Sequence, residues 1–245
     1  MLREKVIVRL AEEKDITAIR TLLAMMIPSA FGNGKRGEKF LTWRCTTEEW
    51  ITQKNAFLRN LIDGEKSAIH VAEIDGIIQG ISFIDHDEFS GNFVSKHWRR
   101  RWIGSLLMTR GLDSMVSWGY TDAWVGVAEF AEEAQLFYKG CGFKISSYET
   151  MDLPPGHNGR ATGTEFEVRD LKMELADTAK ARDTLTQKLG LGAIAFEDTV
   201  EIDLGLLHHI RAFIRRFANR CSTRVRLVAK RLDGWRTLAP IVWQP

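Results

Sequence analysis

The sequence contains few cysteines: Cys45, Cys141 and Cys221 are the three among its 245 residues. They are odd in number and far apart, and their spacing matches no zinc-binding motif. This excludes a dense disulfide framework and gives no support for a cysteine-based metal site. We expect free thiols in a reducing compartment and no bound metal.

Long apolar runs are also lacking. No segment of the chain approaches the roughly 18 consecutive apolar residues that a membrane-spanning helix needs. The N-terminal stretch MLREKVIVRLAEEKD lacks the apolar core of a signal peptide. We therefore expect a cytoplasmic protein that makes no membrane contact.

A strong excess of one charge is missing from the whole chain but not from its C-terminal part. The formal net charge is +2, yet the segment from Asp203 to Pro245 holds nine Arg or Lys and only two Asp or Glu. This asymmetry indicates a contact surface for an anionic partner, with a merely solvated basic face as the alternative.

Hydrophobic periodicity predicts alternating strands and helices over the first 175 residues. The boundaries of these elements are marked by helix-capping residues, by a Pro at the end of one helix and by an Asp-Gly turn between two strands. In chain order, the expected elements are a strand at Val6–Leu10, a helix capped by Asp15 and stopping at Pro28, a helix from a Thr46-x-x-Glu49 capping box to Gly64, strands at Ser67–Glu73 and Ile77–Asp85 joined by Asp75-Gly76, a helix from Ile103 to Gly119, a strand at Ala123–Val127, a helix from Glu132 to Lys139, and strands at Ile145–Met151 and about Glu165–Leu175. The last strand also fits a heptad pattern that continues to Leu189.

A basic turn joins a short apolar run, Phe93-Val94, to the helix that begins near Ile103. The first backbone N–H groups of a helix lack internal partners, and the helix dipole favours negative charge there. Three arginines in the turn strengthen the prediction of a phosphate site, because one guanidinium group can donate two parallel hydrogen bonds to the oxygens of a phosphate. A solvated basic turn is the alternative. The residues of the turn are Arg99, Arg100, Arg101 and Trp102, followed by Ile103, Gly104 and Ser105.

Two motifs in this stretch resemble the GNAT (Gcn-related) N-acyltransferase family. That family has a strand ending in Val-x-Pro, an aromatic residue, and then Arg/Gln-x-x-Gly-x-Gly/Ala at the helix start. Val94, Trp98, Arg99 and Gly104 fit this pattern. Downstream, the run FYKGCGF at 137–143 is similar to the family's Phe-Tyr-x-x-x-Gly-Phe. The resemblance covers residues 1–175 and implies an α/β GNAT fold, in which a central mixed sheet is flanked by helices.

The resemblance also implies a function and a site. It implies transfer of an acyl group from acetyl-CoA, or another acyl-CoA, to an amine of a small molecule or a protein. Tyr138 would be the catalytic residue that protonates the departing thiolate. The residues implied to bind the donor are Phe93, Val94, Arg99, Arg100, Arg101, Trp102, Ile103, Gly104, Ser105 and Tyr138.

Four residues depart from the family pattern. Lys96 replaces the proline, Arg100 and Trp102 replace glycines, and Ala131 replaces an asparagine that often touches the cofactor. Glycine at the position of Trp102 lets the backbone approach the pyrophosphate. The alternative function is therefore a catalytically degenerate GNAT-fold protein, or a GNAT-like nucleic-acid modifier, that binds nucleic acid or a protein.

Two glutamates are candidate general bases for the acceptor amine. Glu88 belongs to the acidic cluster Asp85-His86-Asp87-Glu88, and Glu129 follows the strand at Ala123–Val127. A solvated strand end is the alternative for the cluster. The glycine-rich segment Phe31–Phe40 is expected to be a loop, either a mobile linker or, as in the family, a cover over the acceptor.

Beyond residue 175 the resemblance ends, and we expect a separate extension, 176–245. Its predicted elements are a helix at Ala176–Leu189, a basic helix at Asp203–Arg220, and a β-hairpin from Thr223 to Trp243 with basic side chains on one side. The extension is too small to fold alone, so it is expected to pack on the first domain or on a second subunit as a homodimer. Residues 203–245 could alternatively contact nucleic-acid phosphates.

Overall fold

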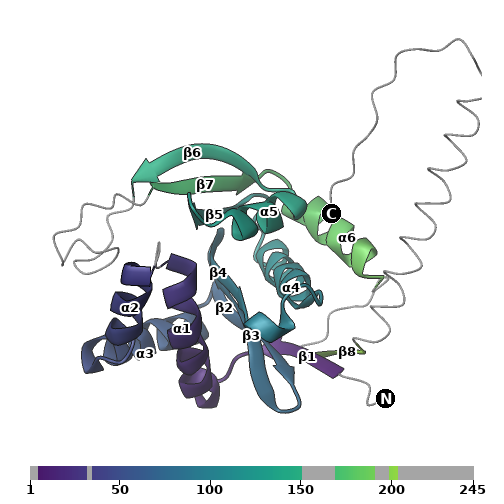
Figure 1. The fold of residues 1–245 in the computed structure, drawn as a ribbon. Helices are drawn as coiled ribbons and strands as arrows, with labels where there is room; N and C mark the ends of the chain where they lie inside the picture. The colour runs from purple at the N-terminus through teal and green to yellow at the C-terminus, as the bar shows by residue number, and fades with distance from the viewer. Residues whose placement is uncertain (1–4, 32–34, 151–168, 191–198, 204–245) are drawn as a thin grey trace, which may run out of the picture.

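The computed structural model describes residues 5–31, 35–150, 169–190 and 199–203 (Figure 1). In this part of the chain, strands form one mixed sheet in the order β6-β7-β5-β4-β3-β2-β1-β8, with helices on both faces. This confirms the predicted α/β class. The elements are β1 (Lys5–Leu10), α1 (Ile16–Phe31), α2 (Lys35–Arg44), α3 (Glu48–Asp63), β2 (Ser67–Ile74), β3 (Ile77–Asp85), β4 (Glu88–Val94), α4 (Ile103–Ser117), β5 (Ala123–Ala128), α5 (Glu132–Gly140), β6 (Lys144–Thr150), β7 (Arg169–Leu175), α6 (Thr178–Leu189) and β8 (Thr199–Asp203), with 3-10 turns at Glu13–Asp15 and Lys96–Trp98.

Alternation along β2 shows how the sheet separates two helical layers. Ile69 and Val71 are buried in a cluster with residues of α1 and α3. Ala72 and Ile74 are buried in a second cluster with the first turns of α4. Successive side chains of a strand point to opposite faces, so α1 and α3 cover one face and α4 covers the other. A third cluster joins α4, α5 and α6 to β5 and β7.

The β2–β3 hairpin confirms the predicted turn. Asp75 and Gly76 connect the strands, with φ angles of 51° and 76°. Positive φ at both central residues matches the right-handed twist of the flanking strands, which is why Asp-Gly is favoured here.

Two predictions about the first helix are wrong. Asp15 ends the 3-10 turn instead of capping α1, and its carboxylate accepts from Arg9 at 2.6 Å and from the Glu12 N–H at 2.9 Å. The helix also continues through Pro28 to Phe31. Proline in the last turn removes one backbone hydrogen bond close to the end of the helix, so the remaining residues can still complete the turn.

The predicted loop at Phe31–Phe40 is wrong over Lys35–Phe40, which belongs to α2. Gly37 disfavours a helix by about 1 kcal/mol. The buried side chains of Leu41 and Cys45, which follow it, show that tertiary packing outweighs this local cost. The next N-cap is Thr47, whose hydroxyl accepts from Trp50 N at 3.3 Å, so the cap predicted at Thr46 is misplaced by one residue.

Gly111 lets α4 lie close to the sheet. A Cβ added there would lie 2.5 Å from a ring atom of Phe89 and 2.6 Å from the Cδ1 of Ile84. We expect Gly111→Ala to lower the free energy of unfolding by about 1–3 kcal/mol, because overpacking forces neighbouring side chains from their rotamers. Urea unfolding would measure this. Gly140→Ala is the control, since nothing lies within 4 Å of its added Cβ; equal stability of both variants would contradict the prediction.

The chain beyond Leu175 adds to the same sheet. Helix α6, predicted at Ala176–Leu189, packs against α4, and β8 pairs antiparallel with β1. The predicted division at residue 175 stays a prediction. The helix expected at Asp203–Arg220, apart from its first residue, and the hairpin from Thr223 lie outside the described residues. The predicted contacts of 203–245 with nucleic acid, and the homodimer, likewise stay predictions.

Candidate functional site

Strands β4 and β5 lie side by side and parallel, but they pair at one end only. Their register contains the single pair Glu88↔Trp124, and Trp124 N donates to Asp87 O at 2.9 Å. The strands therefore separate toward their carboxyl ends. Helix α4 follows β4 and α5 follows β5, so both helices begin at the open end of this split (Figure 1). Helix N-termini of this kind favour an anionic ligand.

The turn before α4 holds the backbone in a conformation typical of glycine. Arg100 has φ 60° and Trp102 has φ 70°, and these are the two positions at which the similar family carries glycine. Each left-handed residue costs about 1–2 kcal/mol, which the surrounding structure must offset. Trp102 is the N-cap of α4 and has no side-chain capping bond, so it does not cap the first-turn amides.

The packing of the Trp102 indole helps to offset the energetic cost of the left-handed backbone in this turn. It packs, partly buried, against an apolar cluster that includes Val6, Ile103 and Leu107. This contact anchors the side chain on the core that lies under the first turns of α4. The turn thus keeps a glycine-like backbone although its residues are large.

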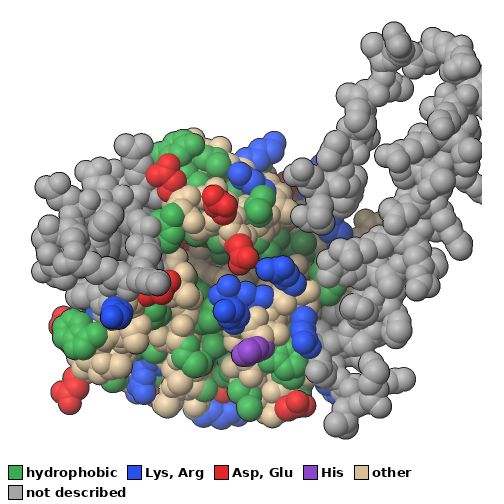
Figure 2. All heavy atoms as spheres, in the orientation of Figure 1, with side chains coloured by type: hydrophobic (Ala, Val, Ile, Leu, Met, Phe, Trp, Pro, Cys, Tyr) green, Lys and Arg blue, Asp and Glu red, His purple; other side chains and the backbone are tan. Residues whose placement is uncertain are grey.

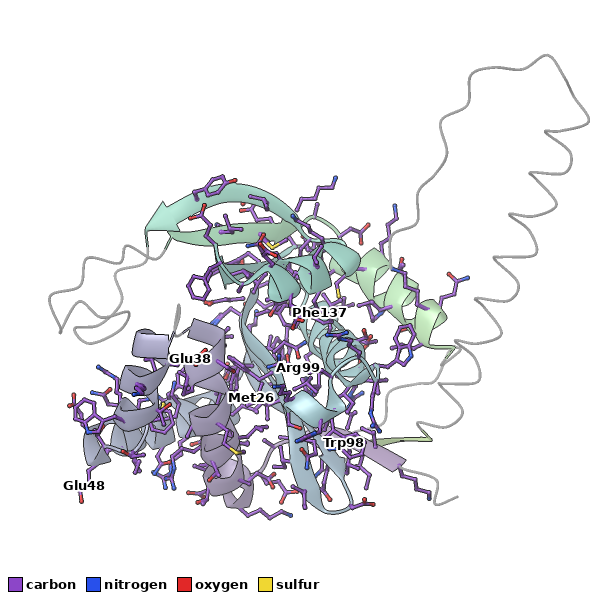
Figure 3. The ribbon with its side chains drawn as sticks, viewed as in Figure 1. Met26, Glu38, Glu48, Trp98, Arg99 and Phe137 are labelled. Atoms are coloured by element: carbon purple, nitrogen blue, oxygen red, sulfur yellow. The ribbon has the colours of Figure 1, made fainter. Side chains whose placement is uncertain are left out.

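Two arginines of the turn have different neighbours: Arg99 lies near Glu133 of α5, and Arg101 lies over the ring of Trp98. Arg99 donates through Nε to Val94 O at 3.2 Å and extends toward Glu133 of α5. The guanidinium of Arg101 lies 4.8 Å from the ring centroid of Trp98. Basic and acidic side chains adjoin near the middle of the face shown in Figure 2. Figure 3 places Arg99 and Trp98 below Phe137 of α5.

Tyr138 lies on α5 and is buried, at 5% exposure. Its ring makes edge contacts with Phe137 and Phe143, at centroid distances of 5.3 and 5.6 Å. Burial raises the pKa of Tyr138, and the neighbouring Cys141 raises it further. The phenol therefore stays protonated at neutral pH.

Phe137, the neighbour of Tyr138, brings α5 up to α4. A Cβ added at Gly104 would lie 3.4 Å from the Phe137 ring, so these two residues are in near contact. An added Cβ would make an ordinary van der Waals contact with the ring, so the two helices that border the split approach each other closely here. Phe137 was not predicted as a site residue from the sequence, because its partner Gly104 lies on another helix.

The two candidate bases lie in different parts of the site. Glu88 is the first residue of β4, where β4 and β5 are still paired, and Glu129 follows the last residue of β5 at the open end. Glu88 is therefore separated from the arginine turn by the length of β4, about 20 Å. Burial raises the pKa of Glu88, and Asp85 and Asp87 raise it further. Both residues stay predictions.

A β-bulge on β4 is a further feature that the sequence did not reveal. Phe83 pairs with Gly91 but Ile84 pairs with Phe89, which leaves Ser90 as the extra residue. Bulges are frequent next to functional sites because they release backbone groups from the ladder. Two residues on, Asn92 donates to Gly104 O at 3.1 Å and ties β4 to the start of α4.

In the part of the chain that the structure describes, no group of three or more His, Cys, Asp or Glu residues is arranged to hold a metal ion. The helices there are also too short or too polar to cross a membrane.

Comparisons with known proteins agree with this geometry. A model of the acetyltransferase (GNAT) domain matches residues 35–152. An uncharacterized N-acetyltransferase of Mycobacterium tuberculosis (strain ATCC 25618 / H37Rv) is 31% identical over 97 residues, which is 38% of this chain. The match spans 62% of the length of that relative.

Solved structures show the same fold at low sequence identity. An N-acetyltransferase from Staphylococcus aureus Mu50 has a TM-score of 0.53 and 18% identity, covering 71% of this chain and 98% of that one. The PaiA N-acetyltransferase from Thermoplasma acidophilum, in complex with coenzyme A, has a TM-score of 0.50 and 15% identity, covering 70% and 98%. The domain match, the split sheet and the motifs at 94–104 and 137–143 make this chain similar to the GNAT acetyltransferases.

Proposed function

We propose that this protein is an N-acetyltransferase that moves the acyl group of acetyl-CoA, or of a related acyl-CoA, to an amine. The observation that carries the proposal is the convergence of two helix N-termini and the arginine turn at the open end of the β4–β5 split, beside the helix that holds Tyr138. The N-acetyltransferase PaiA, which shares the fold, was solved with coenzyme A.

The turn supplies the groups that a diphosphate needs. The amides of Ile103, Gly104 and Ser105 lie in the first turn of α4 and lack intrahelical acceptors. Arg99, Arg100 and Arg101 would add charge-assisted hydrogen bonds. The glycine-like φ of Arg100 and Trp102, and the packing of the Trp102 indole against the core, support a turn that still fits the donor.

The chemistry would be a single acyl transfer. The neutral amine attacks the thioester carbonyl, a C–N bond forms and the C–S bond breaks. Tyr138 gives its proton to the departing sulfur, and a base takes the proton that the amine loses. The raised pKa of Glu88 supports it as that base, since a carboxyl group with a pKa closer to neutrality is a better base. The position of Glu129 beyond β5 supports the rival assignment.

Calorimetric titration with acetyl-CoA tests the donor site directly. We expect the wild type and Trp102→Gly to bind with dissociation constants within about tenfold of each other, in the micromolar to millimolar range common for enzyme substrates. The reason is that the indole packs against the core under α4, so its removal opens no blocked site.

Two outcomes of this titration would contradict the proposal. Binding by Trp102→Gly alone would show that the indole closes the site in the wild type. Binding by neither protein would remove the support for an acyl-CoA donor. If both bind, release of free thiol with a panel of amines would then identify the acceptor class.

A further inference from the structure

Glu133 on the first turn of α5 forms an ion pair with two arginines of the turn before α4. Its Oε2 lies 3.6 Å from Nη1 of Arg99, and its Oε1 lies 3.6 Å from Nη2 of Arg100. Each carboxylate oxygen thus faces one guanidinium. The exposed fractions of the side chains are 74% for Glu133, 39% for Arg99 and 87% for Arg100.

This ion pair connects the two arms of the split sheet. Arg99 and Arg100 follow β4, whereas Glu133 follows β5, and β4 and β5 are paired only at their opposite ends. The labelled positions in Figure 3 show Arg99 close beneath the helix that carries Phe137 and therefore Glu133. The carboxylate lies where the two helices begin, which is the position that favours an anion.

We propose that Glu133 is an internal competitor of the donor's diphosphate, so that acyl-CoA must displace its carboxylate from Arg99 and Arg100. This inference rests on the proposed function, in which the arginine turn binds the diphosphate. A carboxylate and a phosphate use the same guanidinium hydrogens, so the arginines cannot serve both fully. Glu133 is exposed enough to turn toward water when the diphosphate enters. It therefore sets the donor affinity without touching the reacting atoms.

The test is titration of coenzyme A into the wild type, Glu133→Gln and Glu132→Gln at low ionic strength. Glu132 is the matched control, because it is exposed on the same helical turn and none of the ion pairs found in the described residues involves it. We expect Glu133→Gln to bind coenzyme A about fivefold more tightly, which corresponds to one exposed ion pair. Glu132→Gln should change the affinity by less than about twofold. The gain should shrink at 0.5 M salt, where exposed charges are screened.

A titration with dephospho-coenzyme A shows which phosphate group competes with Glu133. Dephospho-coenzyme A keeps the diphosphate but lacks the 3′-phosphate, so the gain of Glu133→Gln should persist with it. A gain that disappears with this ligand would overturn the inference, because the competition would then involve the 3′-phosphate.

The remaining outcomes separate the inference from the proposed function. Unchanged or weaker binding by Glu133→Gln, with a wild type that binds, would overturn the inference and leave the function intact; it would mean that Glu133 orients the arginines. Equal gains in both glutamine variants would also overturn it, since only net charge would matter. Failure of all three proteins to bind coenzyme A would overturn the donor site itself.

Discussion

Tyr138→Phe is expected to lower kcat for acyl transfer by about 10²-fold, the smaller end of the range for a general acid. The affinity for acetyl-CoA should stay within about threefold, because phenylalanine keeps the edge contacts of the ring with Phe137 and Phe143. Without the hydroxyl, the sulfur must leave as a thiolate or take its proton from water. Steady-state rates of thiol release and calorimetric binding would measure the two effects separately.

The control is Tyr148→Phe, since Tyr148 is 63% exposed on β6 and lies on no part of the proposed site. Equal rates for Tyr138→Phe and the wild type would show that this tyrosine only packs. The raised pKa of Tyr138 adds a second signature. Because the phenol stays protonated well above neutral pH, loss of its proton should not limit kcat in the neutral and mildly alkaline range.

His70 is expected to make the protein markedly less stable at acid pH. Its side chain is 2% exposed on β2, under α4, and its Nε2 lies 3.0 Å from Ser114 Oγ. Burial, together with the charge of Arg110, lowers the pKa of His70 to about 3 from the ordinary value of 6.5. Between these two pH values, the unfolded chain binds a proton that the folded protein does not.

Protonation therefore favours the unfolded state, and this group's contribution to stability is lost as the pH falls below about 6.5. From pH 7.5 to pH 5 the loss should be about 2 kcal/mol, at about 1.4 kcal/mol per pH unit below the unfolded pKa. Urea unfolding of the wild type and His70→Gln at both pH values would measure it. The amide does not titrate, so the variant should lose about 2 kcal/mol less. An equal loss in both proteins would rule out His70 as the source.

Local patterns were sufficient for the strands and helices that follow one another closely. The Asp75-Gly76 hairpin, the helix ending at Gly119 and the α5 motif were predictable because turn residues and apolar periodicity lie within a few positions of each other. The helix over Lys35–Arg44 was not, since its stability comes from packing against α1 rather than from its own residues. The pairing of β8 with β1 was not predicted either, because its two strands lie far apart in the sequence.

At the candidate site, too, local motifs were predictable from the sequence, whereas contacts between distant segments were not. The motifs predicted which residues form the turn and placed Tyr138 on α5, whereas its catalytic role stays a prediction. They did not predict that Trp102 adopts a left-handed backbone with its indole on the core, since that depends on the α4 cluster. They also did not predict the ion pair of Glu133, because Arg99 and Arg100 meet it only after β4 and β5 separate. The C-terminal basic segment, for which nucleic acid was an expected partner, lies outside the described residues.

The pairing of β1 with β8 has a consequence for synthesis on the ribosome. Val6 pairs with Ile202 and Val8 with Val200, so nearly two hundred further residues must be made after β1 before its outer side is covered. At about 20 residues per second this interval lasts about ten seconds. During it, a nascent β1 already paired with β2 would present a row of unpaired N–H and C=O groups, the kind of edge that recruits other chains. Synthesis of β8 would thus close the β1 edge of the sheet, and a chain stalled or truncated before β8 would leave that edge exposed to chaperones and to aggregation.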